Sequence, residues 1–492
     1  MKWIAVIDSL SDNRFARESV FEGRSAEQLC ADAVLSLKEE ADIVRLVRPG
    51  EAASYGDGIR TQEVAAGDAE SWFAALETVC AGYDALLRVC GDAPFADPEL
   101  MRKTMNEHVE TAADFTYGEG FPSGLCPETV ETDLLPVLAG LNKEAPLPHR
   151  SLFPYFEKQI NDYDISVVIA PHDNRRLRLS LYADSFRRLQ LLRRLAAAAN
   201  GSVTEAFINA NEKLLLTAPA FYPVQIVDAR VQSPVYLPKE LSAAAGSGTE
   251  MPPERFRQLL ETAAEISGTF AVSLSMNGDP VCHSRVYEMI EAALASQAST
   301  VLIETAGLRW DTARVEELTS KGNGRLVWIV LLDAADAQEY RALRGDGFEE
   351  ANAFAEKMTA AFPGCVYVQA LRLKGYEETV DRFYRVWSAK TSGVIIQKHD
   401  TYGGLVPEMK AVDLSPLLRY PCWHLKRELP VLADGTVPMC ADDLTRTVVR
   451  GNLFTDSRET IFESIRRQYE EQTEGHYHGI CGGCDEYYTF HF

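Results

Sequence analysis

The sequence predicts an α/β protein with a mainly parallel sheet in its first part and a full or partial β/α barrel after it. Two observations favour this fold class. Short apolar runs alternate with stretches of helical periodicity as far as about residue 400, and 46% of the 492 residues are apolar, enough for sizeable cores. At about 150 residues per domain, the length indicates about three domains.

The first region has the order strand, helix, strand, helix, strand. These elements are expected at 2–8, 26–38, 41–47, 69–80 and 84–91. Apolar residues at helical spacing over 186–196 predict a closing helix, which Gly201 can cap in the left-handed conformation. We therefore expect a first domain over 1–200.

The second region repeats the alternation several times, which is typical of a β/α barrel. Strands and helices are expected in turn at 220–231, 253–266, 270–276, 286–296, 299–307, 324–334, 348–362, 365–373 and 377–387. The alternation ends near Lys398, and the remainder holds turns, two short helices and four of the ten cysteines. We expect a barrel-like domain over 218–400 and a small third domain over 401–492.

The charge balance argues against two classes of partner. The 49 Lys and Arg residues face 72 Asp and Glu residues, a formal net charge of −23, and no run concentrates basic side chains. Nucleic acids and anionic membranes attract basic surfaces, so we expect neither as a partner. The apolar run at 327–332 is too short to cross a membrane and the N-terminus lacks a signal-peptide pattern, so we expect a cytoplasmic protein.

Four cysteines form the candidate metal site: Cys422, Cys440, Cys481 and Cys484, spaced C-x17-C-x40-C-x2-C. A C-x2-C pair directs two thiolates to one centre, and two further cysteines complete an all-sulfur set that suits zinc or a [4Fe-4S] cluster. Asp434 and Gly435 predict a type I′ hairpin that returns Cys440 toward Cys422. The alternative interpretation, buried small hydrophobes, suits the other six cysteines better.

The C-terminal region resembles the SPASM or "twitch" region of radical S-adenosylmethionine enzymes. CWHLKRELPVLADGTVPMC, then Gly451 and Asn452, then CGGC match that family's order of Cys, Gly-x4-Cys, Gly-Asn-hydrophobic and Cys-x2-Cys. The further cysteines of a full SPASM domain do not follow. The resemblance therefore implies one auxiliary [4Fe-4S] cluster held by all four thiolates, without an open iron site.

The middle region resembles the barrel of the same enzymes and then departs from it. Gly278, Asp279 and Pro280 are similar to that family's Gly-Glu-Pro segment. Its first barrel loop carries C-x3-C-x2-C, which holds the cluster that binds S-adenosylmethionine. The corresponding places here are Arg230, Pro234 and Leu237. The whole pattern resembles the spiro-SPASM proteins, which implies a radical-type barrel without S-adenosylmethionine cleavage, and we expect no cysteine near the barrel mouth.

The first region resembles the cytidylyltransferases that activate acidic sugars. VCGDAPFADPELM places Asp92 where that family holds Mg²⁺ against the triphosphate, and FPSGLCPETV places Gly124 and Glu128 in its substrate segment. SDNRFARESVF keeps Arg14 of the phosphate loop. The resemblance implies a nucleotide site at these four residues, with Mg²⁺ as its cofactor.

Two departures weaken this second resemblance. Arg17 and Glu18 replace the Gly-Lys pair of the phosphate loop, and a Glu near a triphosphate adds repulsion. The second metal-binding Asp falls on Tyr182 unless a two-residue shift brings in Asp184. We expect a retained fold used for binding or docking, with nucleotidyl transfer as the less favoured alternative.

These patterns together predict a cytoplasmic iron–sulfur protein with one [4Fe-4S] cluster. Its expected role is electron transfer, or cluster-dependent assembly with an unidentified protein partner or redox donor. The alternatives are a four-cysteine zinc protein, a cytidylyltransferase that uses CTP and Mg²⁺, and a barrel that binds a peptide or small substrate for another enzyme. The sequence leaves open whether the protein is an enzyme.

Overall fold

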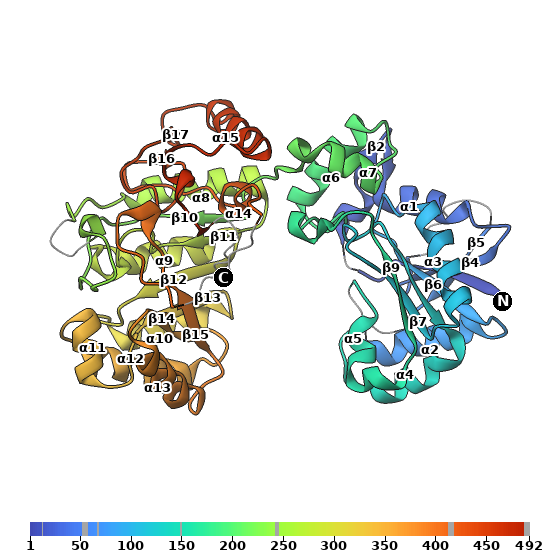
Figure 1. Cartoon of the computed structure of the whole chain (residues 1–492), viewed down its shortest axis with the longest axis horizontal. Coiled ribbons are helices and arrows are strands. Elements are labelled where there is room, and N and C mark those ends of the chain that lie inside the picture. Colours follow the sequence, from blue (N-terminus) through green and yellow to red (C-terminus); the bar gives the residue numbers. More distant parts are fainter. Residues whose placement is uncertain are drawn as a thin grey trace. The chain divides into compact units, whose positions relative to one another are not determined.

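The computed structural model describes residues 1–11, 13–51, 58–65, 68–147, 150–241, 246–411 and 418–486. The chain forms two compact units, Met1–Leu215 and Leu216–Phe492, each built of helices and strands (Figure 1). The expected second and third domains both lie in the second unit. Within the described ranges, no helix combines the length and apolarity needed to cross a membrane.

The first unit is built on a seven-stranded sheet of order β5-β4-β1-β6-β8-β7-β9. Its strands are β1 (Trp3–Asp8), β4 (Ala41–Val47), β5 (Ile59–Glu63), β6 (Ala85–Cys90), β7 (Phe115–Glu119), β8 (Glu128–Glu131) and β9 (Ile165–Ile169). Only β8 among them runs antiparallel to its neighbours. The sheet is therefore mainly parallel and Rossmann-like, which confirms the predicted fold class.

Helices cover both faces of this sheet, so the side chains of β1 point alternately into two hydrophobic cores. Ile4 and Val6 pack in one core with α2, whereas Ala5 and Ile7 pack in the other with α1 and α3. The helices of the unit are α1 (Ala26–Leu35), α2 (Ala69–Cys80), α3 (Pro98–Thr111), α4 (Leu135–Leu141), α5 (Phe153–Phe156), α6 (Phe186–Ala198) and α7 (Glu205–Ala210). Burial on both faces is the usual state of a mainly parallel sheet.

The second unit contains six parallel strands in sequence order, which curl into a half-barrel (Figure 1). The strands are β10 (Phe221–Pro223), β11 (Phe270–Ser273), β12 (Ala298–Thr305), β13 (Leu326–Leu331), β14 (Val366–Arg372) and β15 (Val394–Lys398). The helices that alternate with them are α8 (Pro253–Ser267), α9 (Val286–Ala295), α10 (Thr312–Gly322), α11 (Ala337–Arg344), α12 (Phe348–Ala361) and α13 (Glu377–Ser388). This order is the one that a partial β/α barrel requires, as predicted.

The two faces of the half-barrel sheet are packed very differently. The helix-covered face belongs to the large core of the unit, which includes Val272, Val301 and Trp328. On the other face, the buried hydrophobic side chains form a small cluster of Phe221, Leu302 and Ile329. The thin packing on this second face leaves room for a cavity at the carboxyl ends of the strands.

The end of the chain attaches to the first strand of the half-barrel. After α14 (Trp423–Arg427), Leu429 N–H donates to the Phe221 carbonyl at 3.0 Å and Val431 N–H donates to the Pro223 carbonyl at 2.9 Å. The hairpin of β16 (Thr436–Pro438) and β17 (Val449–Asn452) and the helix α15 (Arg458–Thr473) follow. This parallel extension of β10 fixes the cysteine-rich segment beside the mouth of the half-barrel.

Candidate metal centre

A tight hairpin positions Cys440. Gly435 has φ +86°, and a Cβ at this position would lie 2.3 Å from the Phe454 ring, so only glycine fits. Asp434 does not share the positive φ, and its carboxylate accepts from Thr436 N–H at 2.9 Å. The predicted type I′ turn is therefore wrong, because that type needs positive φ at both central residues, but the predicted hairpin is present.

One glutamine connects two of the four cysteines. Gln472, buried near the end of α15, accepts from Cys422 N–H at 2.8 Å through its Oε1. Its Nε2 donates to Cys481 Sγ at 3.7 Å. Cys481 Sγ also lies 3.8 Å from Met439 Sδ, next to Cys440 in the chain. Gln472 thus links Cys422 to Cys481, and Cys481 in turn contacts the residue before Cys440.

Salt bridges anchor the C-x2-C pair to the end of β15. Lys398 Nζ lies 2.6 Å from a Glu486 carboxylate oxygen and 3.0 Å from one of Asp485. Lys410 also pairs with Asp485. Glu486 N–H donates to Cys484 Sγ at 3.3 Å. A hydrogen bond of this kind favours the thiolate, which is the form that binds metal.

The four thiols are close enough to influence one another. Burial raises the pKa of Cys440 well above its usual value and that of Cys481 to about 11, and it also raises that of Cys484. The Cys422 thiol adds to the increase in all three. Within the described ranges, no three His, Cys, Asp or Glu side chains stand at metal-holding distances. The assignment of the four cysteines as ligands therefore stays a prediction.

A buried arginine faces these thiols. The Arg450 side chain on β17 is buried, and its Nε donates to Gln468 Oε1 at 2.8 Å. Its two terminal nitrogens have no hydrogen-bond partner in the described part of the chain. Burial lowers its pKa to about 10, while Cys440, Cys422 and Cys481 act in the opposite direction. The Asp443 carboxylate also acts in that direction, but its oxygens accept from Thr447 and Val448 and no salt bridge to Arg450 forms within the described residues. A guanidinium is expected to remain charged here, so its terminal nitrogens lack a directly bonded negative partner.

The donor set and this arginine fit an iron–sulfur cluster. Four thiolates suit iron, and a cluster with four thiolate ligands is anionic, so it would supply the charge that the Arg450 guanidinium lacks. The neighbouring histidines are not needed as ligands. His476 and His478 are largely exposed, and each lies near a glutamate, Glu474 at 3.8 Å and Glu471 at 3.5 Å respectively.

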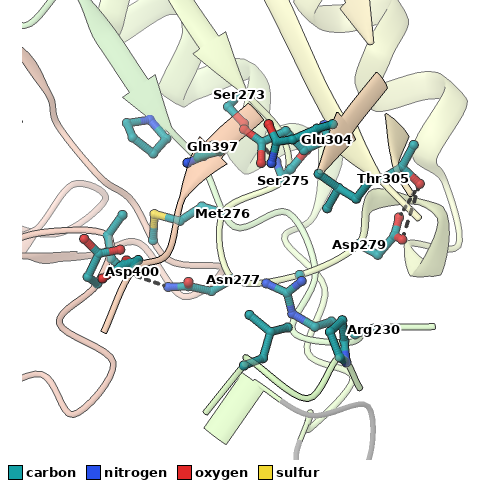
Figure 2. Close-up of a pocket in the computed structure, with 18 of the residues that line it drawn as sticks. Arg230, Ser273, Ser275, Met276, Asn277, Asp279, Glu304, Thr305, Gln397 and Asp400 are labelled. Atoms are coloured by element: carbon teal, nitrogen blue, oxygen red, sulfur yellow. Dashed lines mark hydrogen bonds between the residues drawn. The ribbon is translucent and has the colours of Figure 1, made fainter. Parts of the chain in front are cut away.

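A cavity of about 220 Å³ lies between the carboxyl ends of the half-barrel strands and the cysteine-rich segment. Figure 2 shows residues that line it. Arg230, Pro234 and Leu237 all line this cavity, as expected for residues at the first barrel loop. Cys440 also lines it, so the expectation that no cysteine comes near the barrel mouth is wrong. The reason is the attachment of the C-terminal segment to β10, which brings Cys440 to the cavity wall.

Asp279 is a buried structural group at this mouth. Its carboxylate accepts from the Thr305 hydroxyl at 3.0 Å and from Ala306 N–H at 3.1 Å, at the end of β12 (Figure 2). Burial raises its pKa, which these hydrogen bonds and the charge of Arg230 partly counter. Asp279 thus ties the loop after β11 to the next strand.

Asp400 is a second unusual acid in the cavity wall. Burial raises the pKa of this carboxyl to about 9, and the charges of Asp442 and Glu486 add to the increase. Its Oδ1 accepts from Tyr402 N–H at 2.7 Å. Asp400 therefore carries a proton at neutral pH and contributes no charge to the cavity.

The predicted Mg²⁺ residues of the first unit are held by an arginine. Asp92 is buried, and its Oδ1 accepts from Arg150 at 2.6 Å. The same guanidinium donates to Asp184 at 2.8 Å and lies 3.7 Å above the centre of the Tyr182 ring. Asn13 Nδ2 donates to the other oxygen of Asp92 at 3.2 Å. Arg150 thus occupies the position between the two aspartates that a divalent cation would take, and the arrangement does not fit Mg²⁺.

The other predicted nucleotide residues do not form an open site. Glu128 lies 3.5 Å from Arg88 and accepts from Leu152 N–H at 3.0 Å, and burial raises its pKa. Gly124, at φ +98°, borders a cavity of only about 20 Å³ together with Glu128. Arg14 is exposed, 4.8 Å from the Phe15 ring centre, and makes no hydrogen bond to Asp92 or Glu128 within the described residues. A space of this size admits about one water molecule, not a nucleotide.

Sequence reasoning missed three residues that define these sites: Arg150, Arg450 and Asp400. Arg450 immediately precedes the Gly-Asn pair of the cysteine module, and that position was the one available signal. Arg150 and Asp400 stand in no motif. Their importance comes from partners far along the chain, such as Asp92, which is 58 residues from Arg150.

The fold and the site together define an α/β protein with a Rossmann-like unit and a half-barrel unit that carries clustered cysteines. No protein-family model matches the chain. An uncharacterized protein of Treponema pallidum (strain Nichols) is 34% identical over 357 residues, which span 69% of this chain and 98% of that protein. The chain belongs to the family of this Treponema pallidum protein.

Two solved structures are similar to parts of this chain at low sequence identity. A cytidylyltransferase from Leptospira borgpetersenii is 15% identical, covering 43% of this chain and 93% of its own, with a TM-score of 0.36. SuiB of Streptococcus suis, bound to the precursor peptide SuiA, is 12% identical, covering 65% of this chain and 78% of its own, with a TM-score of 0.43.

Proposed function

We propose that the protein is a cytoplasmic iron–sulfur protein that holds one [4Fe-4S] cluster through Cys422, Cys440, Cys481 and Cys484. The observation that carries the proposal is the buried Arg450 guanidinium, which faces the thiols with two unpartnered terminal nitrogens. Zinc bound by four thiolates and an iron–sulfur cluster are both anionic, so the charge alone does not select between them. The resemblance of the cysteine pattern to the SPASM region favours the cluster.

The proposed role is electron transfer. Four thiolates leave a cluster without an open iron site, which suits the passage of electrons rather than direct binding of a substrate. Cys440 lines the 220 Å³ cavity, so one edge of the cluster would lie next to any molecule bound there. Electrons would pass between the cluster and that molecule, or a protein partner.

Purification under anaerobic conditions tests the cluster directly. We expect about four iron and four sulfide ions per chain and a broad absorbance near 400 nm, as for cubane clusters in general. Cys422→Ser, Cys440→Ser, Cys481→Ser and Cys484→Ser should each lower the iron content strongly. Cys365→Ser is the matched control in the same unit and should retain iron. A colourless protein with stoichiometric zinc would contradict the proposal.

The first barrel loop should not support radical chemistry, because Arg230, Pro234 and Leu237 cannot ligate iron. The reduced protein, incubated with S-adenosylmethionine, is expected to form no 5′-deoxyadenosine. Detection of that product above the level seen with the Cys440→Ser variant would overturn this part of the proposal.

The first unit is proposed to serve as a binding or docking unit without nucleotidyl transfer. The support is the salt bridge of Arg150 to both Asp92 and Asp184, which neutralises the pair that would hold Mg²⁺. Calorimetric titration of the full chain with CTP and Mg²⁺ should release no heat of binding. Saturable binding at millimolar nucleotide would contradict this proposal and favour a nucleotidyltransferase activity.

A further inference from the structure

The strongest unexplained feature of the cavity is the side chain of Arg230. Its Nε is buried and has no partner, and within the described ranges its guanidinium makes no hydrogen bond or salt bridge. In Figure 2 this guanidinium points into the cavity between Asn277 and Asp279. The charge of Asp279 acts on it from a distance, but no salt bridge joins the two side chains, and the Asp279 oxygens accept from Thr305 and Ala306 instead. A guanidinium has five donors, and buried donors in proteins almost always have acceptors.

The other basic side chains of the cavity wall are already neutralised. Arg344 pairs with Asp333 at 2.6 Å, Lys398 pairs with Glu486 at 2.6 Å, and His424 lies 3.0 Å from Glu428. Burial lowers the pKa of His399, and that ring bonds the Pro407 carbonyl at 3.2 Å. Arg230 is therefore the cation of the described cavity wall whose charge is not matched by a salt bridge.

We propose that this cavity binds a small organic molecule through one carboxylate or phosphate group, which the Arg230 guanidinium receives as a forked pair of hydrogen bonds. Arginine is well suited to planar, two-point recognition of oxyanions. The volume of about 220 Å³ admits an organic ligand rather than a lone ion. The proposal does not depend on the cluster, because Arg230 belongs to the loop that follows β10 of the half-barrel.

The remainder of the wall restricts the ligand to a single anionic group. Ser273, Ser275 and Glu304 lie across the cavity from Arg230 (Figure 2), and Asp442 also lines it. A second negative charge on the ligand would face these carboxylates, which would repel it. Hydroxyl or amino groups at that end would instead find acceptors. The expected ligand is therefore a molecule with one carboxylate or phosphate group and with neutral or positively charged groups elsewhere.

Modification of arginines by phenylglyoxal tests the proposal on the full chain, with labelling mapped by mass spectrometry at constant ionic strength. Arg230 should be labelled in chloride buffer, and acetate or inorganic phosphate should lower its labelling several-fold. The acetate and phosphate arms distinguish a carboxylate from a phosphate ligand. Citrate should protect less because of its extra charges. The exposed Arg341, which pairs with Asp346, is the internal reference and should not change. Equal labelling of Arg230 in all buffers, or equal protection of Arg341, would overturn the proposal.

Thermal unfolding of variants provides a second test. Acetate or phosphate should raise the midpoint for the wild type and for Arg341→Gln, whereas Arg230→Gln should show no increase. Arg230→Lys keeps the charge without the fork and should retain part of the increase. If Arg230→Gln does not fold, the labelling experiment on the wild type still tests whether Arg230 binds the anion. An increase of the same size in Arg230→Gln would place the anion elsewhere.

Discussion

Arg150 in the first unit and two arginines in the second differ in how their charges are matched. In the first unit, Arg150 donates to Asp92 at 2.6 Å and to Asp184 at 2.8 Å, so the buried acids are matched by a cation from the same chain. In the second unit, the terminal nitrogens of Arg450 and the Nε of Arg230 have no partner within the described residues. Although Arg150 Nε and Asp184 Oδ1 make no hydrogen bond, the charges of the first group are paired within the chain. An unpaired buried charge is costly, so the second arrangement calls for a partner from outside the chain. The contrast shows that the charges, more than the fold, indicate which unit binds a cofactor or ligand.

Among the substitutions considered, removal of Arg150 is expected to lower the free energy of unfolding the most. Arg150→Met keeps the aliphatic stem but leaves the buried Asp92 without its cationic partner, whereas Asp184 keeps its salt bridge to Arg188. Loss of one partner of a largely buried ion pair costs about 3–5 kcal/mol of unfolding free energy. Denaturant unfolding measures this loss. The same variant should gain a site for a divalent cation between the aspartates, seen as binding of Mn²⁺ by paramagnetic resonance.

The double variant Arg150→Met/Asp184→Asn is the control for both readouts. It should recover part of the lost stability and should lose the Mn²⁺ site, because only one carboxylate remains. Equal Mn²⁺ binding by the wild type and Arg150→Met would mean that the arginine does not occupy the cation position.

Asp400 differs from the acids of the first unit, because its carboxyl group is neutralised by its own proton and not by a neighbouring cation. Its pKa is about 9 in the folded protein, above that of an unfolded Asp, so folding takes up a proton between these values. The stabilising contribution is complete at pH values below the unfolded pKa and is lost as the pH rises through about 9. The wild type should therefore lose stability from pH 5 to pH 9.

Asp400→Asn removes this titration and keeps the shape of the side chain. At pH 9 the variant should exceed the wild type by on the order of 2 kcal/mol, whereas at pH 5 the two should be similar. Urea unfolding at a series of pH values measures the difference. Parallel stability profiles of the two proteins would show that Asp400 is ionised in the folded state.

Arg450 should give the smallest effect on stability, but one whose sign depends on the cluster. In cluster-free protein, Arg450→Leu removes a guanidinium with unsatisfied donors, so it should raise the unfolding free energy by about 1 kcal/mol. In protein loaded with the cluster, the same change removes the compensating charge, so the reduction potential should become more negative and iron should be released faster.

Arg344→Leu is the matched control, because Arg344 is equally buried but pairs with Asp333 at 2.6 Å. It should destabilise both forms and leave the reduction potential unchanged. Destabilisation of the cluster-free protein by Arg450→Leu would indicate that Arg450 has a partner within the chain.

Much of the fold could be read from local patterns. The predicted helix at 69–80 has the same bounds as α2 (Ala69–Cys80), because apolar residues at helical spacing must be buried on one side. The prediction missed α10, whose buried hydrophobic side chains are only Val315 and Leu318. It also missed β15, which is short and only half-buried. Such elements are stabilised by neighbours in the fold rather than by their own periodicity.

The candidate site divides in the same way. Spacing along the chain was enough to select the four cysteines, because metal ligands must be thiolates in a compatible order whatever surrounds them. The turn at Gly435 was expected, but its type depended on the φ of Asp434, which is not positive. The place of Cys440 in the cavity wall required the pairing of 428–431 with β10, which no local pattern encodes.

Residue types and their order therefore established the alternation of elements, the acidic charge and the choice of thiol ligands, since each of these follows from the properties of neighbouring residues. The folded arrangement alone decided which charges are satisfied. Arg150 pairs with two aspartates, Arg450 lies near three of the four thiols and Arg230 lines an open cavity, although all three are the same amino acid. A charge is stabilised by what lies within a few ångströms of it, and chain folding brings those groups together from distant positions.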